Sequence, residues 1–322
     1  MNEKNWSVEI GGHVKKILVT GGAGYVGSGL VFELLQKGCA VRVIDSLMFG
    51  GRGLLPCFAN KNFEFRKADL RDRKVVADAL EGQDAVIHLA ALVGYPACKR
   101  EPKLAEETNV GITQHITELA GKNQELYYAS TGSNYGAILG DLCTERTQLN
   151  PLTAYGITKT HAEKIMQEAG AVVYRFATAF GVSNRLRLDL LINDFVYRAL
   201  KERNLIIYEK HFKRTFIHVR DMTHAFVFAL DNHAKMKGEV YNVGHESMNY
   251  SKEDIALKLR EKLDFYLHFA EVGKDEDQRN YEVSYEKIRK LGFETKVTID
   301  EGLDELIRAM AVIEVKNEFA NV

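Results

Sequence analysis

The sequence contains few cysteines, and no two of them stand close together. Its 322 residues include only four, Cys39, Cys57, Cys98 and Cys143, with no C-x-x-C pair among them. A disulfide-held scaffold and a structural zinc site both need closely spaced cysteines. The spacing therefore argues against both classes and is typical of the reduced thiols of a cytosolic protein.

The chain also lacks excess charge and long apolar runs. Lys and Arg total 43 against 44 Asp and Glu, which gives a formal net charge of −1. This balance provides no overall field to attract nucleic acid or an anionic membrane. No stretch approaches the roughly 18 apolar residues of a membrane span, and residues 1–10 contain no apolar core of signal-peptide length. We expect a soluble, cytoplasmic protein that binds neither nucleic acid nor membrane.

No metal centre is predicted. His218, Asp221 and His224 follow one another at intervals of three residues across a predicted strand–helix junction. That spacing directs the three side chains to different sides of the junction, so buried structural histidines are the better interpretation.

The first half of the chain alternates between strand and helix patterns. Helical periodicity predicts helices over residues 25–37, 72–80 and 104–120. Short apolar runs predict the strands between them, at 16–20, 40–45, 63–65, 85–89 and 126–129. This order predicts an α/β fold with a doubly wound parallel sheet of the Rossmann type.

After about residue 175 the alternation becomes less regular. The predicted strands are 205–208, 215–219 and 240–243, and the predicted helices are 189–202, 221–231, 252–263 and 299–315. We therefore expect residues 1–175 to form the nucleotide-binding domain and residues 176–322 a smaller α/β lobe for the substrate. The crevice between them is the expected ligand site.

A glycine-rich turn follows the first predicted strand. Gly22-x-Gly24-x-x-Gly27 matches the dinucleotide fingerprint and stands between a strand and a helix, as that fingerprint requires. Glycines here let the backbone approach a pyrophosphate, whose charge the helix N-terminus meets. Asp45 ends the second strand, where its carboxylate can bind the adenosine ribose and would repel a 2′-phosphate. The pattern predicts NAD rather than NADP as the cofactor.

Tyr155 and Lys159 stand four residues apart in a predicted helix, and therefore on one face of it. A tyrosine, with a pKa of about 10, is a poor base at neutral pH. A neighbouring ammonium and the positive nicotinamide ring of NAD⁺ both favour the phenolate and lower that pKa. We expect Tyr155 to be the catalytic base, and Lys159 to lower the pKa of Tyr155 and to bind the nicotinamide ribose.

Hydroxyl side chains stand where the strand predicted over residues 126–129 ends. Side chains at the C-terminal end of a parallel strand point into the ligand crevice. Thr131 is therefore our candidate for the group that hydrogen-bonds the reacting hydroxyl, and Ser133 is a second candidate.

Together these positions make the chain similar to extended short-chain dehydrogenases/reductases that act on nucleotide sugars. The matching positions are 20–27, Asp45, Asp69, 88–91, Asn109, 130–131, Tyr155, Lys159, Arg175 and 214–221, which span nearly the whole chain. The resemblance implies NAD as cofactor and a nucleoside-diphosphate sugar as substrate. It also implies a homodimer or larger homo-oligomer, formed through the helices around 104–120 and 153–169.

The resemblance further assigns individual residues. For the cofactor it implies Gly21, Gly24, Tyr25, Val26, Gly27, Asp45, Asp69, Leu70, Leu89, Ala90, Ala91, Tyr155 and Lys159. For the substrate it implies Thr131, Ser133, Thr178, Asn193, Arg214 and Arg279, with the two arginines holding the diphosphate. Thr178 stands where many relatives have an Asn.

The reactions of such enzymes share oxidation of the sugar at C4 and differ in the step after it. The 4,6-dehydratases carry an Asp-Glu pair directly after the Thr, whereas this chain has Gly132 and Ser133, which disfavours dehydration. Segments 92–100, 187–195 and 209–214 are similar to GDP-heptose C4-dehydrogenases of capsule biosynthesis. We therefore expect NAD-dependent C4 oxidation of a nucleotide sugar, with GDP favoured, in surface polysaccharide biosynthesis.

Two alternatives stay open. A 4-epimerase would return the hydride to the other face of the keto sugar. A non-catalytic NAD-sensing protein of the same fold would typically lack the Tyr155–Lys159 pair or the glycine turn, and this chain has both.

Overall fold

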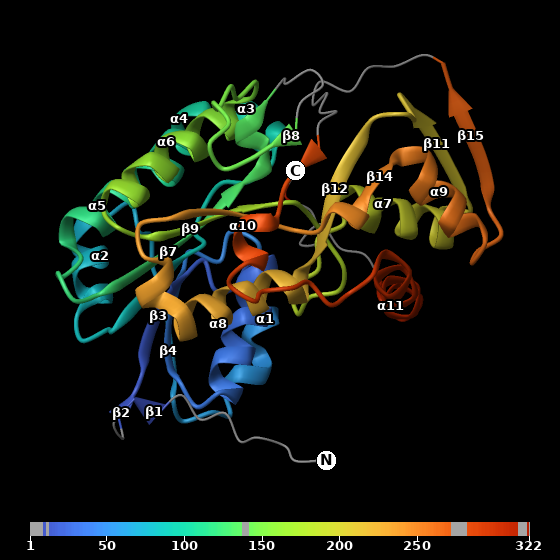
Figure 1. The fold of residues 1–322 in the computed structure, drawn as a ribbon. Helices are drawn as coiled ribbons and strands as arrows, with labels where there is room; N and C mark the ends of the chain where they lie inside the picture. The colour runs from blue at the N-terminus through green and yellow to red at the C-terminus, as the bar shows by residue number, and fades with distance from the viewer. Residues whose placement is uncertain (1–8, 11–12, 137–141, 272–281, 315–320, 322) are drawn as a thin grey trace.

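A seven-stranded parallel sheet forms the centre of the larger part of the protein (Figure 1). The computed structural model that contains it describes residues 9–10, 13–136, 142–271, 282–314 and 321. The strand order is β13-β9-β7-β6-β3-β4-β5, and every neighbouring pair is parallel. The strands are β3 Lys16–Thr20, β4 Ala40–Asp45, β5 Phe63–Lys67, β6 Ala85–His88, β7 Glu125–Thr131, β9 Val172–Phe176 and β13 Val240–Val243. This is the Rossmann-like sheet that the sequence predicts, so the predicted fold class is confirmed.

Helices cover both faces of the sheet, which explains why its strands read as continuous apolar runs. Successive strand residues point to opposite faces. On β3, Ile17 and Val19 belong to the buried cluster with α1 and α8, whereas Leu18 belongs to the cluster with α2, α5 and α6. These helices are α1 Tyr25–Gln36, α2 Arg73–Leu80, α5 Ile112–Leu119, α6 Ala154–Glu168 and α8 Val219–Met236.

The helix expected over residues 104–120 is a composite. α4 Pro102–Glu106 continues into a π-helical turn, η2 Glu107–Gly111, which leads into α5. Such turns widen a helix locally and redirect one side chain. Asn109 in this turn is buried, accepts a hydrogen bond from the Leu92 amide at 2.7 Å and donates to the Leu92 carbonyl at 3.0 Å. It thereby holds the segment that follows β6.

The chain returns to the large sheet late, so the expected boundary at residue 175 is not where the two parts separate. β13 pairs with β9 in the large sheet, and α8 packs against α1 beneath it. Tyr241 and Met222 therefore belong to the core of the nucleotide-binding half, although the sequence predicted both for the smaller lobe. A parallel strand pairs by long-range contacts, which local sequence patterns do not reveal.

The smaller lobe has its own sheet pieces and its own apolar core. β10 Thr178–Phe180, β12 Lys213–His218 and β14 Asn249–Ser251 form one sheet, and β11 Asn204–Tyr208 pairs with β15 Tyr266–Ala270. The helices around this core are α7 Leu191–Tyr197, η4 Arg198–Glu202, α9 Lys252–Arg260 and α11 Ile299–Ala311. α9 and α11 begin with complete capping boxes, as their sequences indicate.

Short elements complete the described structure. They are β1 Glu9–Ile10, β2 His13–Val14, β8 Leu142–Cys143, β16 Glu282–Val283, α3 Tyr95–Arg100, α10 Glu286–Arg289, η1 Arg52–Cys57, η3 Gly132–Tyr135 and η5 Glu246–Met248. Within the described parts of the chain, every helix falls short of the length or the apolar character that crossing a membrane requires.

Candidate active site

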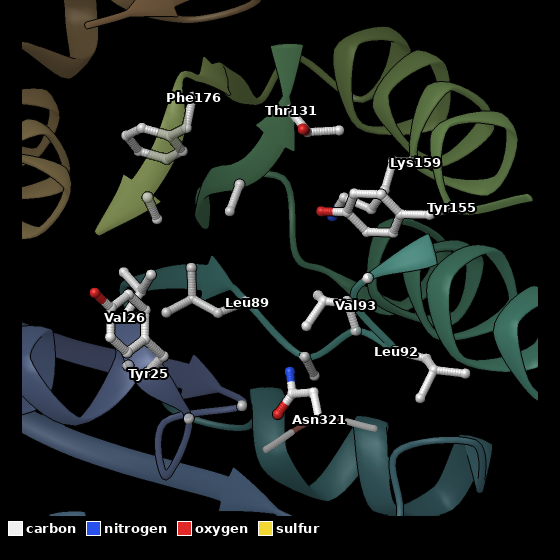
Figure 2. A pocket seen from close by; sticks show the side chains of 18 of the residues that line it. Tyr25, Val26, Leu89, Leu92, Val93, Thr131, Tyr155, Lys159, Phe176 and Asn321 are labelled. Carbon is white, nitrogen blue, oxygen red and sulfur yellow. The ribbon is translucent and has the colours of Figure 1, made fainter. Parts of the chain in front are cut away.

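The C-terminal ends of the parallel strands open into a cavity of about 430 Å³ beside the smaller lobe (Figure 2). Every residue that the resemblance implies for the cofactor lines it, namely Gly21, Gly24, Tyr25, Val26, Gly27, Asp45, Asp69, Leu70, Leu89, Ala90, Ala91, Tyr155 and Lys159. Of the residues implied for the substrate, Thr131, Ser133, Thr178 and Arg214 also line it. The structure thus brings the two predicted groups into one space.

The glycine turn between β3 and α1 has no room for side chains. Gly21 has a positive φ of 71°, and a Cβ added there would lie 2.6 Å from the Ala90 amide nitrogen. A Cβ on Gly27 would lie 2.4 Å from the Gly21 carbonyl oxygen. Gly24 is the N-cap of α1, so the position that precedes the first helical residue also has no side chain. A bare backbone at a helix N-terminus fits the pyrophosphate of a dinucleotide.

Asp45 lies at the end of β4 beside this turn. Its Oδ2 accepts a hydrogen bond from the Ala23 amide at 3.0 Å, and its Oδ1 accepts one from the Leu47 amide at 2.8 Å. Burial raises the pKa of Asp45, while the two amides and the charge of Arg185 act in the opposite direction. Each oxygen keeps a lone pair that can accept from a ribose hydroxyl. This carboxylate therefore fits the predicted NAD.

Replacement of Asp45 by asparagine is expected to lower the preference for NAD over NADP about tenfold or more. The amide keeps an acceptor but loses the charge that repels a 2′-phosphate and that faces Arg185. Calorimetric titration with both cofactors measures the ratio. Asp84→Asn is the matched control, since Asp84 also accepts a backbone amide, that of Lys16 at 2.7 Å, at the opposite end of the sheet. An unchanged ratio in Asp45→Asn would remove Asp45 from cofactor selection.

Segment 181–185 of the smaller lobe is fastened to α1. The Tyr25 hydroxyl donates to the Gly181 carbonyl at 2.7 Å, and the Arg185 amide donates to Ser28 Oγ at 3.2 Å. The Ser183 hydroxyl also donates to the Tyr25 carbonyl. These bonds hold Arg185, which lines the cavity, next to the nucleotide-binding turn.

The predicted catalytic pair lies on the first turns of α6. Thr153 caps this helix, because its hydroxyl accepts a hydrogen bond from the Gly156 amide at 3.1 Å. Figure 2 shows Tyr155 and Lys159 projecting from α6 into the cavity. Gly156 packs closely: an added Cβ would lie 3.0 Å from Pro151 Cβ and 3.3 Å from the Ser133 carbonyl. The glycine thus brings the helix against η3, where Ser133 lies.

Thr131 ends β7 on the same side of the cavity. Its hydroxyl accepts a hydrogen bond from the Ser133 amide and donates to Ser133 Oγ, both at 3.1 Å. Both residues line the cavity with Tyr155. The hydrogen bonds with Ser133 in η3 therefore orient the Thr131 hydroxyl, which lies at the wall of the cavity.

Lys159 is buried, with 3% of its surface exposed. Its ammonium lies 4.1 Å from the centroid of the Tyr128 ring, within the range of a cation–π interaction. Burial lowers the pKa of Lys159 from 10.5 to about 7, and the charge of Glu163 opposes that effect. An ammonium that loses its proton this readily is sensitive to small changes in its surroundings.

Asn193, which was expected to contact the substrate, differs from that expectation in the structure. Asn193 is fully buried and does not line the cavity. Its side chain accepts from the Gly181 amide at 3.0 Å and donates to the Arg187 carbonyl at 2.8 Å, so it braces the backbone behind the cavity instead. Asn193 does not face the substrate because backbone groups occupy both the oxygen and the nitrogen of its side-chain amide. Arg279 lies outside the described residues.

Cations that the sequence analysis did not single out also line the cavity. They are Arg71, Arg185, Arg187 and Lys213; Arg175, one of the positions that carry the resemblance, lines it too. Arg187 is held by Asp189, at 3.0 Å for Nε and 2.5 Å for Nη2. Arg187 and Lys213 fall within segments 187–195 and 209–214. The similarity of those segments was therefore the sequence signal that could have pointed to these two cations. Such cations suit a ligand that carries several phosphates.

The histidine singled out beside Asp221 has a structural setting. His218 is fully buried, and its Nδ1 accepts the Arg220 amide at the start of α8 at 3.2 Å. Burial lowers the pKa of His218 to about 3. Among the residues that the structure describes, no cluster of three or more His, Cys, Asp or Glu side chains could hold a metal ion.

Comparison with known proteins agrees with this geometry. The model of the NAD dependent epimerase/dehydratase family matches residues 17–244. The protein y4nG of Sinorhizobium fredii is 32% identical over 273 residues, which cover 82% of this chain and 63% of that protein. A putative UDP-glucose 4-epimerase of Methanocaldococcus jannaschii is 26% identical over 314 residues, which cover 91% and 98% of the two chains.

A solved structure extends the agreement to three dimensions. The UDP-glucuronic acid 4-epimerase of Bacillus cereus, in complex with UDP-glucuronic acid and NAD, superposes with a TM-score of 0.83 at 25% identity. The match covers 92% of this chain and 99% of that chain. With its glycine turn, its carboxylate at the end of β4 and its Tyr155–Lys159 pair, this chain belongs to the NAD-dependent epimerase/dehydratase family and is an NAD-dependent enzyme of the short-chain dehydrogenase/reductase type.

Proposed function

We propose that the protein oxidises a nucleoside-diphosphate sugar at C4, with NAD as hydride acceptor, and produces a 4-keto sugar. The observation that carries the proposal is the gathering of Tyr155, Lys159 and Thr131 at one cavity whose other end carries the glycine turn and Asp45. That cavity combines a cofactor cradle with a base beside it.

The roles of the residues follow from their chemistry. NAD, when bound, supplies the hydride acceptor. Tyr155, as phenolate, takes the proton of the C4 hydroxyl, and the ammonium of Lys159 stabilises that phenolate. Thr131 hydrogen-bonds the same hydroxyl and orients it. Arg187, Lys213 and Arg214 line the cavity and supply positive charge for a diphosphate.

The lining of the cavity argues against a subsequent dehydration. Removing water across C5 and C6 needs a proton donor and a base near the sugar. Among the described lining residues, the only carboxylates are Asp45, which ends β4, and Asp69, which follows β5, both at the nucleotide end. Gly132 and Ser133 follow Thr131 instead of two carboxylates. An elimination would therefore lack its acid and base.

The finer proposal is a C4-dehydrogenase of the GDP-heptose type that acts in surface polysaccharide biosynthesis in the cytoplasm, as a homodimer. Its support is the resemblance of segments 92–100, 187–195 and 209–214, since residues of all three line the cavity: Leu92, Val93, Gly94, Arg187, Leu190, Lys213 and Arg214. If the hydride is released with the product, a second oxidant must regenerate NAD from NADH.

A 4-epimerase is the second candidate. It is supported by the relatives themselves, since the putative UDP-glucose 4-epimerase of Methanocaldococcus jannaschii is similar over 91% of this chain. An epimerase uses the same first step and the same residues, and then returns the hydride to the other face of the sugar.

A panel of GDP-, UDP-, CDP- and dTDP-sugars with NAD tests the proposal. Products are trapped with deuterated borohydride and analysed by mass spectrometry and NMR. We expect deuterium at C4 of a GDP-sugar, with one NADH formed per product. A C4 stereoisomer without net NADH would support the epimerase. A 4-keto-6-deoxy product would contradict the assignment of the cavity, and no reaction with any member would contradict the proposed substrate class.

A further inference from the structure

The charge state of Lys159 depends on few groups. It is 3% exposed, so water contributes little, and its ammonium rests on the ring face of Tyr128 at 4.1 Å. Burial alone favours the neutral amine. A neutral Lys159 could not stabilise a phenolate, so the site needs a nearby negative charge that persists at neutral pH.

The titratable groups of the neighbouring elements do not supply that charge. On β6, His88 is buried, and burial together with Lys159 lowers its pKa to about 3. On α3, burial raises the pKa of Cys98 to about 11, and on β7 burial raises the pKa of Tyr128 well above 10. All three groups are therefore neutral at pH 7.

On α6 itself, Glu163 follows Lys159 by four residues, so the two side chains share one face of the helix. Glu163 is 3% exposed. Its Oε2 accepts from the Ser130 hydroxyl at 2.5 Å and from the Asn134 amide at 2.8 Å. Its Oε1 accepts from Arg175, at 3.0 Å for Nε and 2.6 Å for Nη2. A carboxyl group surrounded by donors on both oxygens is an ionised carboxylate.

Arg175, on β9, is also fixed. It is 6% exposed, and its Nη1 donates to the Tyr135 hydroxyl at 3.1 Å. That hydroxyl donates in turn to Asn242 Oδ1 on β13 at 2.7 Å. The ion pair therefore links α6 with β7, β9 and β13, and neither charge can move away from Lys159 without breaking several buried hydrogen bonds.

We infer that Glu163 is a positioning residue that keeps Lys159 protonated, and that Arg175 limits this influence, so that the buried pair sets the charge of the catalytic lysine. The catalytic consequence rests on the proposed function, because it requires Tyr155 to act as a phenolate beside Lys159. A purely structural pair would fasten α6 to the sheet and leave the titration of Lys159 unchanged.

The test is an NMR titration of Lys159 in the full-length protein labelled with [ε-¹³C]lysine, before and after addition of NAD⁺. The Lys159 signal is assigned by its loss in Lys159→Met. Glu163→Gln is expected to lower the pKa of Lys159 by about one unit or more, and Arg175→Met to raise it. Glu125→Gln is the control, since Glu125 pairs with Lys15 at 2.6 Å at the other end of β7 and should leave Lys159 unchanged.

A single variant leaves one buried charge unpaired and can fail to fold. The double variant Glu163→Gln/Arg175→Met removes both charges and avoids that cost. It too is expected to lower the pKa of Lys159, because it removes the charge of Glu163, which raises that pKa, and the opposing effect of Arg175 is the smaller of the two. An unchanged pKa in the folded double variant would overturn the inference.

The catalytic readout is separate from the titration. Where a substrate is known, the alkaline limb of the kcat/KM profile should move to lower pH in the double variant, by the same interval as the Lys159 pKa. If the sugar panel yields no substrate, the titration still decides the inference. If the titration shifts and the alkaline limb does not, Lys159 does not act through its charge and the catalytic part of the inference fails.

Discussion

Replacement of Tyr155 by phenylalanine is expected to lower turnover about 10²- to 10⁴-fold and to leave NAD binding nearly unchanged. Only the hydroxyl oxygen that accepts the C4 proton is lost, while the ring keeps its place against the buried cluster of Leu92, Ala97, Cys98 and Ala105. Single-turnover NADH formation measures the chemical step, and fluorescence titration measures NAD affinity.

Tyr241→Phe is the matched control for that substitution. Tyr241 is buried on β13 and does not line the cavity, so it should keep full turnover. Turnover of Tyr155→Phe within about threefold of the natural protein would remove Tyr155 from the mechanism. Loss of NAD binding in the same variant would instead assign Tyr155 mainly to the cofactor.

Lys159→Met is expected to abolish turnover and to stabilise the fold. The pKa of Lys159 falls from 10.5 to about 7 on burial, a difference of about 3.5 units. At about 1.4 kcal/mol per unit, protonated Lys159 costs the folded state up to about 5 kcal/mol. Methionine has a similar length and no charge. Allowing for the lost contact with the Tyr128 ring, we expect a gain of about 2–4 kcal/mol at neutral pH.

The sign of this effect gives it a distinct pH dependence. The folded-state pKa lies below the unfolded value, so below about pH 7 both states are protonated and the full cost is present. Between about pH 7 and 10.5 the unfolded state alone keeps the proton, so the free energy of unfolding of the natural protein rises with pH. The advantage of Lys159→Met therefore shrinks over this range and is lost near pH 10.5. The measured difference between the two proteins across this range therefore reports the pKa of Lys159 in the folded state.

Urea unfolding at several pH values measures this difference. Lys15→Met is the comparison, because Lys15 pairs with Glu125 at 2.6 Å and the loss of this ion pair should lower the free energy of unfolding. That variant is expected to be destabilised, with little of the pH dependence seen for Lys159. A destabilised Lys159→Met at pH 6 would show that packing and cation–π contact outweigh the burial of the charge.

The parts of the site that lie within one local motif could be predicted from the sequence. The glycine turn is such a motif, because strand, turn and helix are consecutive and the lack of room at Gly21 and Gly27 follows from that turn. Tyr155 and Lys159 are another, because four residues along a helix fix their common face. The position of Asp45 could also be predicted, because it depends only on where the second strand ends.

The parts that depend on distant contacts could not be predicted in this way. Asn193 has the polar side chain of a ligand-binding residue, but Gly181 and the Arg187 carbonyl use that side chain in the folded protein. β13 joins the large sheet through β9, more than sixty residues earlier in the chain, so the boundary expected at 175 divides one core. The partnership of Glu163 with Arg175 likewise appears only when α6 packs on β9.

A single-turnover reaction with a nucleotide sugar carrying deuterium at C4 tests the central claim most directly. We use the substrate that the sugar panel identifies and follow the label by mass spectrometry of the released cofactor. The account predicts deuterium at C4 of the nicotinamide in the natural protein and little or none in Tyr155→Phe. Product that retains all its deuterium at sugar C4, with an unlabelled cofactor, would contradict it.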